Sequence, residues 1–344
     1  MLSGCYSKTD VLVVDGYPIY PGLYLYFQLQ AISMASQKFE EEYTGKELFE
    51  QTIDDIPTKD WIYTKTVDLA KEFVFIEKSF DRLELDYLNV ELEMAYYDTT
   101  LREEWSTMSY FYTRNGIGYE TFRKAYENYL KSNLLFTALY ITEGGEEEVP
   151  EEEILEVFSN NYTYLDYIRV YKVDEDGAPL TDTKIDSIHK DVEAMKKIAE
   201  DAVKEEGVLF IYPSNIGIQA AFEYYAEINQ LSEEEIEHEM GKMITEHSIL
   251  KTTSTIYEEE YLTMIFEAKY DKFFIYEAED SFYLFCRRSM LEFNDESWLD
   301  YRSVIISELR TDIYLEYLTN NSIMLSVTEK SSARRYFNMK KANI

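Results

Sequence analysis

The sequence predicts an α+β fold, in which a mainly helical region is followed by a region that mixes strands and helices. Apolar residues recur at helical spacing through most of the first 140 residues. Within Glu151–Val173 the pattern changes from helix to strand, and short β-branched and aromatic runs return at Lys272–Glu277 and Ser281–Arg287. Long helical segments on both sides of these strands indicate a fold that keeps its helices and strands in separate regions.

The junction within Glu151–Val173 is the most informative of these segments. A proline and three glutamates precede or begin the helix, where exposed N–H groups favour negative charge. Ile154 and Phe158 fall on one face of that helix. Ile168 and Val170 then alternate with other residues, as in a strand with one buried face.

The N-terminal part is predicted to begin with a hairpin and to continue as helices. Val11–Ile19 contains two short strand-like runs around a turn at Asp15-Gly16. Helices are expected at Pro21–Phe39, Trp61–Ser79, Tyr87–Ser106 and Tyr119–Tyr140. The charged, glycine-containing segment Gly144–Glu148 marks the expected domain boundary.

The mixed region is expected to run from Tyr164 to about Met290. Its helices are predicted at Ser187–Glu206, Ile218–Ile228 and Ser232–His247, the last with a capping box. The two runs that follow are predicted to pair as a hairpin over Ala278–Asp280.

One strong helix is predicted near the C-terminus, at Glu296–Asn320. Its expected apolar side consists of Trp298, Tyr301, Ile305, Leu309 and Leu315. The polar segment Ser331–Ile344 is expected to be frayed.

Charge limits the classes of partner. Acidic residues outnumber basic ones 67 to 33, for a formal net charge of −34, while 46% of the residues are hydrophobic, enough for a packed core. Such a surface repels phosphate backbones, so no nucleic-acid partner is expected. Basic or neutral unfolded polypeptides fit this charge; the alternative is that the charge serves solubility alone.

Aromatic content is high, with 32 Tyr, 19 Phe and 3 Trp. Tyrosine offers a large amphipathic contact area at low entropic cost, which suits binding to varied partners. The same rings also fill cores, and composition does not separate the two uses.

The two cysteines, Cys5 and Cys286, do not indicate a disulfide framework. Leu2-Ser3-Gly4-Cys5 looks like the lipobox of a bacterial lipoprotein, in which the cysteine carries the lipid; a chance match is the alternative. The segments that usually precede such a motif are absent, which fits a start upstream of Met1. Cys286 lies in a strand-like run and is expected to be a buried thiol.

Several phrases together resemble the SurA/PrsA-type extracytoplasmic foldases, lipoproteins and periplasmic proteins with a parvulin-type peptidyl-prolyl isomerase domain. Val11–Ile19 is similar to the family's "V-x-G-x-x-I" opening, and Asn115–Leu130 to its "NG-x-x-x-E-x-F" phrase. Glu151–Val173 resembles the family's entry into the isomerase domain. The resemblance covers most of the chain in order.

The resemblance implies a discontinuous helical chaperone domain with a parvulin-like α+β domain inserted into it. Residues 1–10 would be a lipoprotein tether, and residues 11–149 together with the helix in 291–330 would form the chaperone domain. Residues 150–290 would be the parvulin-like domain, and 331–344 a flexible tail. The expected location is extracytoplasmic, with a membrane anchor through lipid on Cys5.

The resemblance also questions catalysis. Parvulins place two histidines on neighbouring strands; here the first corresponds to Tyr167 and the second to Tyr283 or Leu284. Asp166 cannot simply replace the first, because adjacent residues of a strand point to opposite faces. We therefore expect a degenerate site with isomerase activity weak or lost.

Three functions are compatible with the sequence, and the first two belong to different classes. The first is a lipid-anchored chaperone that binds unfolded secreted polypeptides in an aromatic cradle, with Tyr24, Phe27, Trp61, Trp298 and Tyr301 as the expected contact residues. The second is an active isomerase with a substituted network around Tyr167. The third is an acidic lipoprotein that scaffolds one specific partner.

No cofactor or metal is expected. His238 and His247 lie nine positions apart and match no metal-binding motif, and His189 is expected to be exposed at the start of a helix. Phosphate-binding and dinucleotide-binding loops are absent from the sequence.

Overall fold

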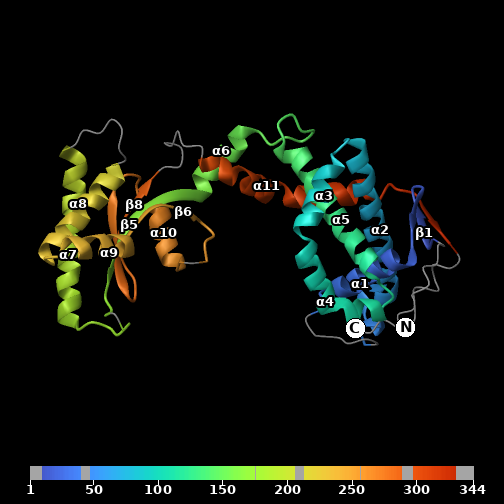
Figure 1. The fold of residues 1–344 in the computed structure, drawn as a ribbon, viewed down its shortest axis with the longest axis horizontal. Coiled ribbons are helices and arrows are strands. Elements are labelled where there is room, and N and C mark those ends of the chain that lie inside the picture. Colours follow the sequence, from blue (N-terminus) through green and yellow to red (C-terminus); the bar gives the residue numbers. More distant parts are fainter. Residues whose placement is uncertain are drawn as a thin grey trace. The chain divides into compact units, whose positions relative to one another are not determined.

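The computed structural model describes residues 10–39, 47–174, 176–205, 213–255, 257–288 and 297–330. The chain forms two compact units, which are described separately (Figure 1). Unit 1 consists of Met1–Val149 and Ile306–Ile344, and unit 2 is the continuous stretch Pro150–Ile305. The predicted α+β class is confirmed, since helices make up most of the described chain and its strands pair in antiparallel sheets.

A three-stranded sheet lies at the start of unit 1. Strands β1 (Leu12–Val14) and β2 (Tyr17–Ile19) form the predicted hairpin, and Asp15 and Gly16 take positive φ angles of 46° and 86° at its turn. Such angles suit a two-residue hairpin turn because they match the twist of the strands. A strand that we did not anticipate, β9 (Val327–Glu329), pairs with the other edge of β1.

Five helices make up most of the described part of unit 1. They are α1 (Pro21–Ser36), α2 (Thr58–Arg82), α3 (Tyr87–Tyr96), α4 (Asp98–Arg114) and α5 (Tyr119–Phe136), followed by a π-helix at Thr137–Ile141. Short elements at Leu48–Glu50, β3 (Thr52–Ile53) and β4 (Ile56–Pro57) connect α1 to α2. The core lies between the sheet, α1 and α2, with Tyr24, Phe27, Phe73 and Val74 among its buried residues.

The prediction of a single helix over Tyr87–Ser106 is wrong. The helix ends at Tyr96, and Tyr97 leaves the helical conformation with φ −88° and ψ 2° before α4 begins at Asp98. Both helices turn apolar residues to one cluster, which contains Val90, Met94 and Leu101. Packing against α5, rather than a sequence signal, sets the break.

Unit 1 also contains a buried cation. The side chain of Lys131 in α5 is 4% exposed, and its Nζ lies 2.9 Å from Glu77 Oε2 and 3.0 Å from Glu127 Oε1. Asn128 donates to Glu77 at 2.8 Å and to the Phe73 carbonyl at 3.1 Å. These bonds to Glu77 satisfy the charge and join α5 to α2.

Unit 2 is built on a four-stranded antiparallel sheet of order β6-β5-β8-β7. Its strands are β5 (Tyr162–Tyr171), β6 (Ile244–Lys251), β7 (Phe273–Glu277) and β8 (Ser281–Arg288). Its helices are α6 (Glu151–Asn161), α7 (Asp182–Glu205), α8 (Pro213–Ile228), α9 (Glu233–Met243) and α10 (Glu259–Glu267). The predicted hairpin of the last two strands is confirmed.

The two faces of this sheet are covered by different helices (Figure 1). Ile168, Phe282 and Leu284 pack against α7 and α8, with Met243 from α9. Alternate residues of the same strands, such as Leu165 and Phe285, pack against α10. This division follows from the two-residue period of a strand.

The predicted helix over Ser232–His247 is wrong in its second part. The capping box of Ser232 and Glu235 is present, but α9 ends at Met243 and the chain continues as β6. Ile244 and Thr245 are β-branched, and they pair with Ile168 and Tyr167 of β5. Pairing with a strand far away in sequence therefore overrides the local helical pattern.

Helix α11 (Ser297–Ser322) contributes residues to both units, because the division falls between Ile305 and Ile306. Its expected apolar side is correct at Ile305, which is buried, and wrong at Leu315, which is 54% exposed. Tyr314 and Leu318 are buried instead. The expected tail at Ser331–Ile344 lies outside the described residues. Within the described residues, no helix is both long and apolar enough to cross a membrane.

Candidate functional site

The two positions that correspond to parvulin histidines lie on one face of the unit 2 sheet. Tyr167 of β5 pairs with Phe285 of β8, and Arg169 pairs with Tyr283, so the two tyrosines are diagonal neighbours. Their ring centroids are 5.5 Å apart, in an edge-to-face arrangement. Leu284 lies on the opposite face, in the core against α7 and α8. Of the two alternatives for the second position, Tyr283 is therefore the residue beside Tyr167.

Helix α10 closes this face with a further tyrosine, Tyr261. Its ring centroid lies 4.3 Å from that of Tyr276, 5.5 Å from Tyr283 and 5.2 Å from Tyr257. Together with Tyr167 these residues form a set that we call the tyrosine cluster. Tyr261 is only 2% exposed, and burial raises its pKa. Burial and the nearby Tyr167 raise the pKa of Tyr257 to about 12.

One cation lies at the border of the tyrosine cluster. The guanidinium of Arg169 is 5.4 Å from the ring centroid of Tyr283 and 4.6 Å from that of Tyr171. Arg169 also pairs with Asp280 at 2.7 Å, which helps to hold the pKa of that carboxyl below its usual range, after the bond from Ser281. This pairing fixes the guanidinium over the rings rather than over an open site.

The tyrosine cluster offers hydroxyl groups but little room for a proline. A prolyl isomerase must seat the proline ring in an apolar pocket and favour the twisted amide through oriented polar groups. Here the ring of Tyr283 lies edge-to-face against Tyr167 and tilted against Tyr261, so the rings fill this part of the face. The cavities on this face lie at the two sides of α10: one of about 450 Å³ beside Tyr257, and one of about 860 Å³ beside Tyr276.

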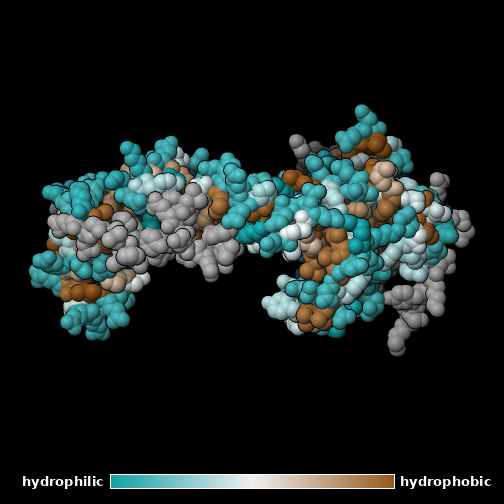
Figure 2. Space-filling view, turned by 90° about the horizontal axis from the view of Figure 1, so that it is seen from above, coloured by the Kyte–Doolittle hydropathy of each residue, from teal (hydrophilic) through white to brown (hydrophobic). Residues whose placement is uncertain are grey.

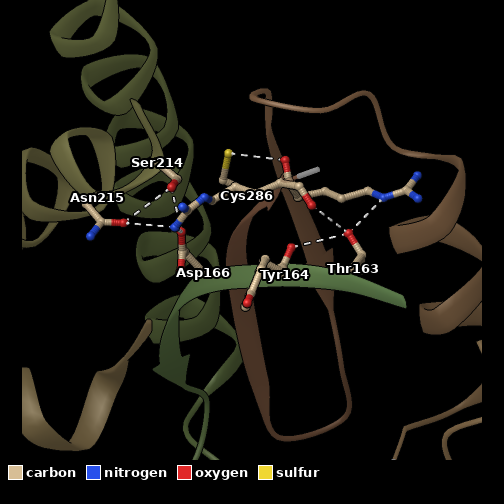
Figure 3. Close-up of polar contacts among 8 residues, drawn as sticks. Thr163, Tyr164, Asp166, Ser214, Asn215 and Cys286 are labelled. Atoms are coloured by element: carbon tan, nitrogen blue, oxygen red, sulfur yellow. Dashed lines mark hydrogen bonds and ion pairs between the residues drawn. The ribbon is translucent and has the colours of Figure 1, made fainter. Parts of the chain in front are cut away.

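Asp166 belongs to a buried network on the face opposite to the tyrosine cluster, as strand alternation predicts (Figure 3). Its Oδ2 accepts from Ser214 Oγ at 2.5 Å and from the guanidinium of Arg288 at 3.0 Å. Asn215 Oδ1 lies 3.5 Å from the same guanidinium nitrogen. Asp166 and Arg288 are 0% and 2% exposed, and their pair joins β5, β8 and α8.

The thiol of Cys286 is buried, as expected. Burial raises its pKa, so it is protonated at neutral pH and is a poor nucleophile. Nearby, Thr163 Oγ1 donates to the Arg288 carbonyl at 2.9 Å and accepts from Arg287 Nε at 3.2 Å (Figure 3). These contacts stabilise the pairing of β5 with β8.

A different set of tyrosines lies at the surface of unit 1, two of them exposed and two half-buried. Tyr96, Tyr97, Tyr126 and Tyr129 form a continuous chain of ring contacts from α3 to α5, with centroid distances of 4.8, 6.2 and 5.8 Å. Tyr96 is 79% and Tyr129 57% exposed. We call these four residues the tyrosine surface. Sequence reasoning missed them, because period alone does not tell an exposed aromatic from a buried one.

A pocket of about 400 Å³ lies between α4 and α5 close to the tyrosine surface. Tyr112 and Phe122 contribute aromatic rings to it, and Glu103 and Glu104 add negative charge. Burial, then Tyr97, then Glu104 raise the pKa of Tyr126, which places the pocket's carboxylate near the tyrosine surface. Figure 2 shows hydrophobic patches among polar residues over the helices of unit 1.

Four of the five expected peptide contacts lie among the described side chains, and none of these four is exposed. Tyr24 and Phe27 are 0% and 4% exposed in the core of unit 1, where a bound chain could not reach them. Trp61 is half-buried and packs against the cluster around Ile62. Tyr301 packs on Phe158 and Tyr162 with centroid distances of 6.1 and 6.0 Å. The side chain of Trp298 and all of Cys5 lie outside the described residues.

The structure also places the candidate metal ligands. His189 stacks on Phe282 with 5.3 Å between centroids, and His238 is exposed on α9; the side chain of His247 lies outside the described residues. Within the described part of the chain, no group of three or more His, Cys, Asp or Glu residues could hold a metal ion.

Comparison with known proteins gives similar structures but no similar family. No family model and no curated protein matches the chain. Among solved structures, the foldase protein PrsA from Streptococcus pneumoniae is 14% identical with a TM-score of 0.33, covering 84% of this chain and 98% of its own. The foldase protein PrsA from Lactococcus lactis is 13% identical with a TM-score of 0.33, covering 97% of this chain and 99% of its own. Both are foldase proteins, the kind of protein that the sequence resembles.

Proposed function

We propose that this protein is a chaperone that binds unfolded secreted polypeptides through the tyrosine surface of unit 1. The observation that carries the proposal is the chain of ring contacts from Tyr96 to Tyr129, whose two end rings are exposed, beside a pocket lined by Tyr112 and Phe122. Exposed rings in mutual contact form an apolar patch, and such patches mark interaction sites. Tyrosine suits varied sequences, because it offers a large contact area and a hydroxyl group with few rotatable bonds.

Charge favours cationic or neutral segments of the client. The pocket beside the tyrosine surface is lined by Glu103 and Glu104, and the chain carries a net charge of −34. Lysine and arginine side chains of a client could cover the rings with their apolar stems and pair with these carboxylates. Acidic clients would be repelled by the same carboxylates, and added salt would weaken this repulsion.

The prolyl isomerase activity of this protein is expected to be weak or lost. Tyr167 and Tyr283 stand where the resemblance implies histidines, and their rings pack within the tyrosine cluster. A proline-limited refolding assay tests this part. We expect at most a small acceleration by the wild-type protein. Strong catalysis that Tyr167→Phe abolishes would instead establish an active isomerase.

The experiment that tests binding is suppression of aggregation of a chemically denatured client at near-stoichiometric ratio. The variant Tyr96→Ser/Tyr129→Ser removes the two most exposed rings of the tyrosine surface and should lose most of the protection. Its matched control is Ile323→Ser/Met324→Ser, which removes two apolar side chains that are 61% and 82% exposed elsewhere in unit 1. Equal loss in both variants, or no protection by the wild type for several clients, would refute the assignment.

Location is a separate part of the proposal. We propose an extracytoplasmic protein attached to the membrane through lipid on Cys5. Mass spectrometry of the protein from its native membrane should find an acylated cysteine at the mature N-terminus. Release of the Cys5→Ser variant from the membrane fraction is the matching expectation, and an unmodified thiol would refute it.

A further inference from the structure

The strand β7 is an edge of the unit 2 sheet, and its first four residues, Phe273–Tyr276, include no charged residue and no proline. β7 pairs with β8 on one side only, so alternate residues direct N–H and C=O groups away from the sheet. Natural edge strands are commonly blocked by Lys, Pro or bulges. β7 reads Phe-Phe-Ile-Tyr-Glu, and its pairing with β8 runs from Phe273 to Glu277 without a register shift.

A groove runs beside this edge on the α10 face. Phe274 and Tyr276 of β7 and Met264 and Ala268 of α10 line its cavity of about 860 Å³. Its carboxylates come from Glu259, Glu260 and Glu267 on α10, all of which are exposed. The groove therefore combines an apolar floor with a negatively charged rim.

The geometry points to an extended cationic segment of a client polypeptide as the occupant: we propose that it adds to β7 as a fifth strand. Alternate side chains of such a strand would lie on the α10 face, in this groove. Lysine or arginine stems would cover Phe274 and Met264 while their charged ends reach Glu260 and Glu267. The remaining side chains would lie beside Ile275, on the apolar face that packs against α7.

This site deepens the proposed function, because it gives unit 2 a binding role that needs no catalysis and names the chemistry of the bound segment. It is separate from the tyrosine surface, and it uses backbone pairing together with charge. Binding here would select extended, basic segments with apolar residues at alternate positions.

Fluorescence anisotropy with a labelled peptide of six alternating leucine and lysine residues tests the site. The measurement uses the full chain carrying Tyr96→Ser/Tyr129→Ser, so that the tyrosine surface does not contribute and failure of one proposal does not decide the other. Glu260→Gln/Glu267→Gln should weaken binding about fivefold, as expected for the loss of two exposed ion pairs. The control Glu234→Gln/Glu237→Gln removes two exposed charges of α9 in the same unit and should leave affinity unchanged.

Two N-methylated peptides test strand addition itself. Methylation of every leucine nitrogen blocks the N–H groups along one side of an extended strand, and methylation of every lysine nitrogen blocks the other side. Loss of binding with one pattern and retention with the other supports pairing to β7. Equal affinity or equal loss with the two patterns would overturn it, as would an equal effect of the two glutamate variants.

Discussion

Both units are rich in tyrosine, but they use it in opposite ways. In unit 1, Tyr96 and Tyr129 are 79% and 57% exposed, and their contacts with Tyr97 and Tyr126 run along the surface. In unit 2, Tyr261 is 2% exposed and stacks among neighbours that close one face of a sheet. The same residue type thus forms an exposed chain of rings on α3 and α5 and a buried cluster beneath α10.

The difference teaches that the site implied by family resemblance and the site implied by exposure need not coincide. The resemblance directs attention to Tyr167 and Tyr283, yet these rings are packed. Exposure directs it to α3 and α5, where no sequence motif was recognised. The buried charges of the two units also have different partners. Lys131 of unit 1 pairs with two carboxylates, whereas the Asp166 carboxylate of unit 2 accepts from Arg288 and Ser214.

The largest expected effect is on unit 2 alone. Asp166→Ala removes the buried carboxylate that accepts from Arg288 and from Ser214, and so breaks a buried ion pair. We expect unit 2 to lose about 3–5 kcal/mol of stability, as for other broken buried pairs. Urea unfolding followed by circular dichroism should change from one transition to two.

A matched control for this change is Arg102→Ala in α4. It breaks an ion pair with Asp98 whose side chains are 64% and 44% exposed, so stability should change by less than about 0.5 kcal/mol. If Asp166→Ala unfolded at the same urea concentration as Arg102→Ala, the Asp166 network would not hold unit 2 together.

A second change tests how tightly α8 packs on β7. A Cβ atom at Gly217 would lie 2.2 Å from Cζ of Phe273 and 3.1 Å from the Ala199 carbonyl oxygen. Gly217→Ala should therefore cost unit 2 about 1–3 kcal/mol through overpacking. Gly241→Ala in α9 meets no atom within 4 Å and should stabilise the same unit by about 0.5–1 kcal/mol, by the helix propensity of alanine. Thermal unfolding of both variants separates the two effects.

A third change should affect both units alike. The hydroxyl groups of Tyr24 in unit 1 and Tyr261 in unit 2 are buried, and neither has a hydrogen-bond partner within the described residues. Tyr24→Phe and Tyr261→Phe should each raise the free energy of unfolding by about 1–2 kcal/mol, because an unsatisfied polar group leaves the core. Chemical denaturation measures both, and a loss of stability in either would reveal a partner for that hydroxyl.

The smallest expected effect is a dependence on alkaline pH. Burial raises the pKa of Tyr261 above its ordinary value of 10.0, so the unfolded chain releases this proton first. The contribution of the neutral Tyr261 side chain to the free energy of unfolding is complete below pH 10, and it is lost as the pH rises toward the folded-state pKa. At pH 11 the loss from this residue should be about 1 kcal/mol. Tyr261→Phe should reduce the decrease in urea midpoint between pH 8 and pH 11, and an unchanged decrease would contradict the assignment.

Much of the fold could be predicted from local pattern. Three elements carry a signal in their own residues. The hairpin at Val11–Ile19 has a turn, the helix that follows Ser232 has a cap, and the strand in Ser281–Arg287 has an alternation. The failures at β6 and β9 have one cause: both strands form by pairing with residues far away in sequence. No local signal contains that information.

The candidate site was predictable only in part. The resemblance indicated Tyr167 and either Tyr283 or Leu284, and strand alternation placed Asp166 on the face opposite to Tyr167. The sequence could not show that Tyr24 and Phe27 are core residues while Tyr96 and Tyr129 are exposed, because all four lie in helices with aromatic neighbours. Tertiary packing separates the two pairs, because Tyr24 and Phe27 of α1 lie in the core formed with the small sheet and α2.

The pairing of β9 with β1 has a consequence for the order in which the chain matures. Leu12 lies opposite Glu329. The small sheet of unit 1 therefore cannot be completed until the ribosome has made a strand more than 300 residues further along the chain. Unit 2 has all of its residues as soon as Ile305 has emerged. Until β9 arrives, the free edge of β1 is open, and a nascent copy would need protection of the same kind that the proposed function offers to other chains.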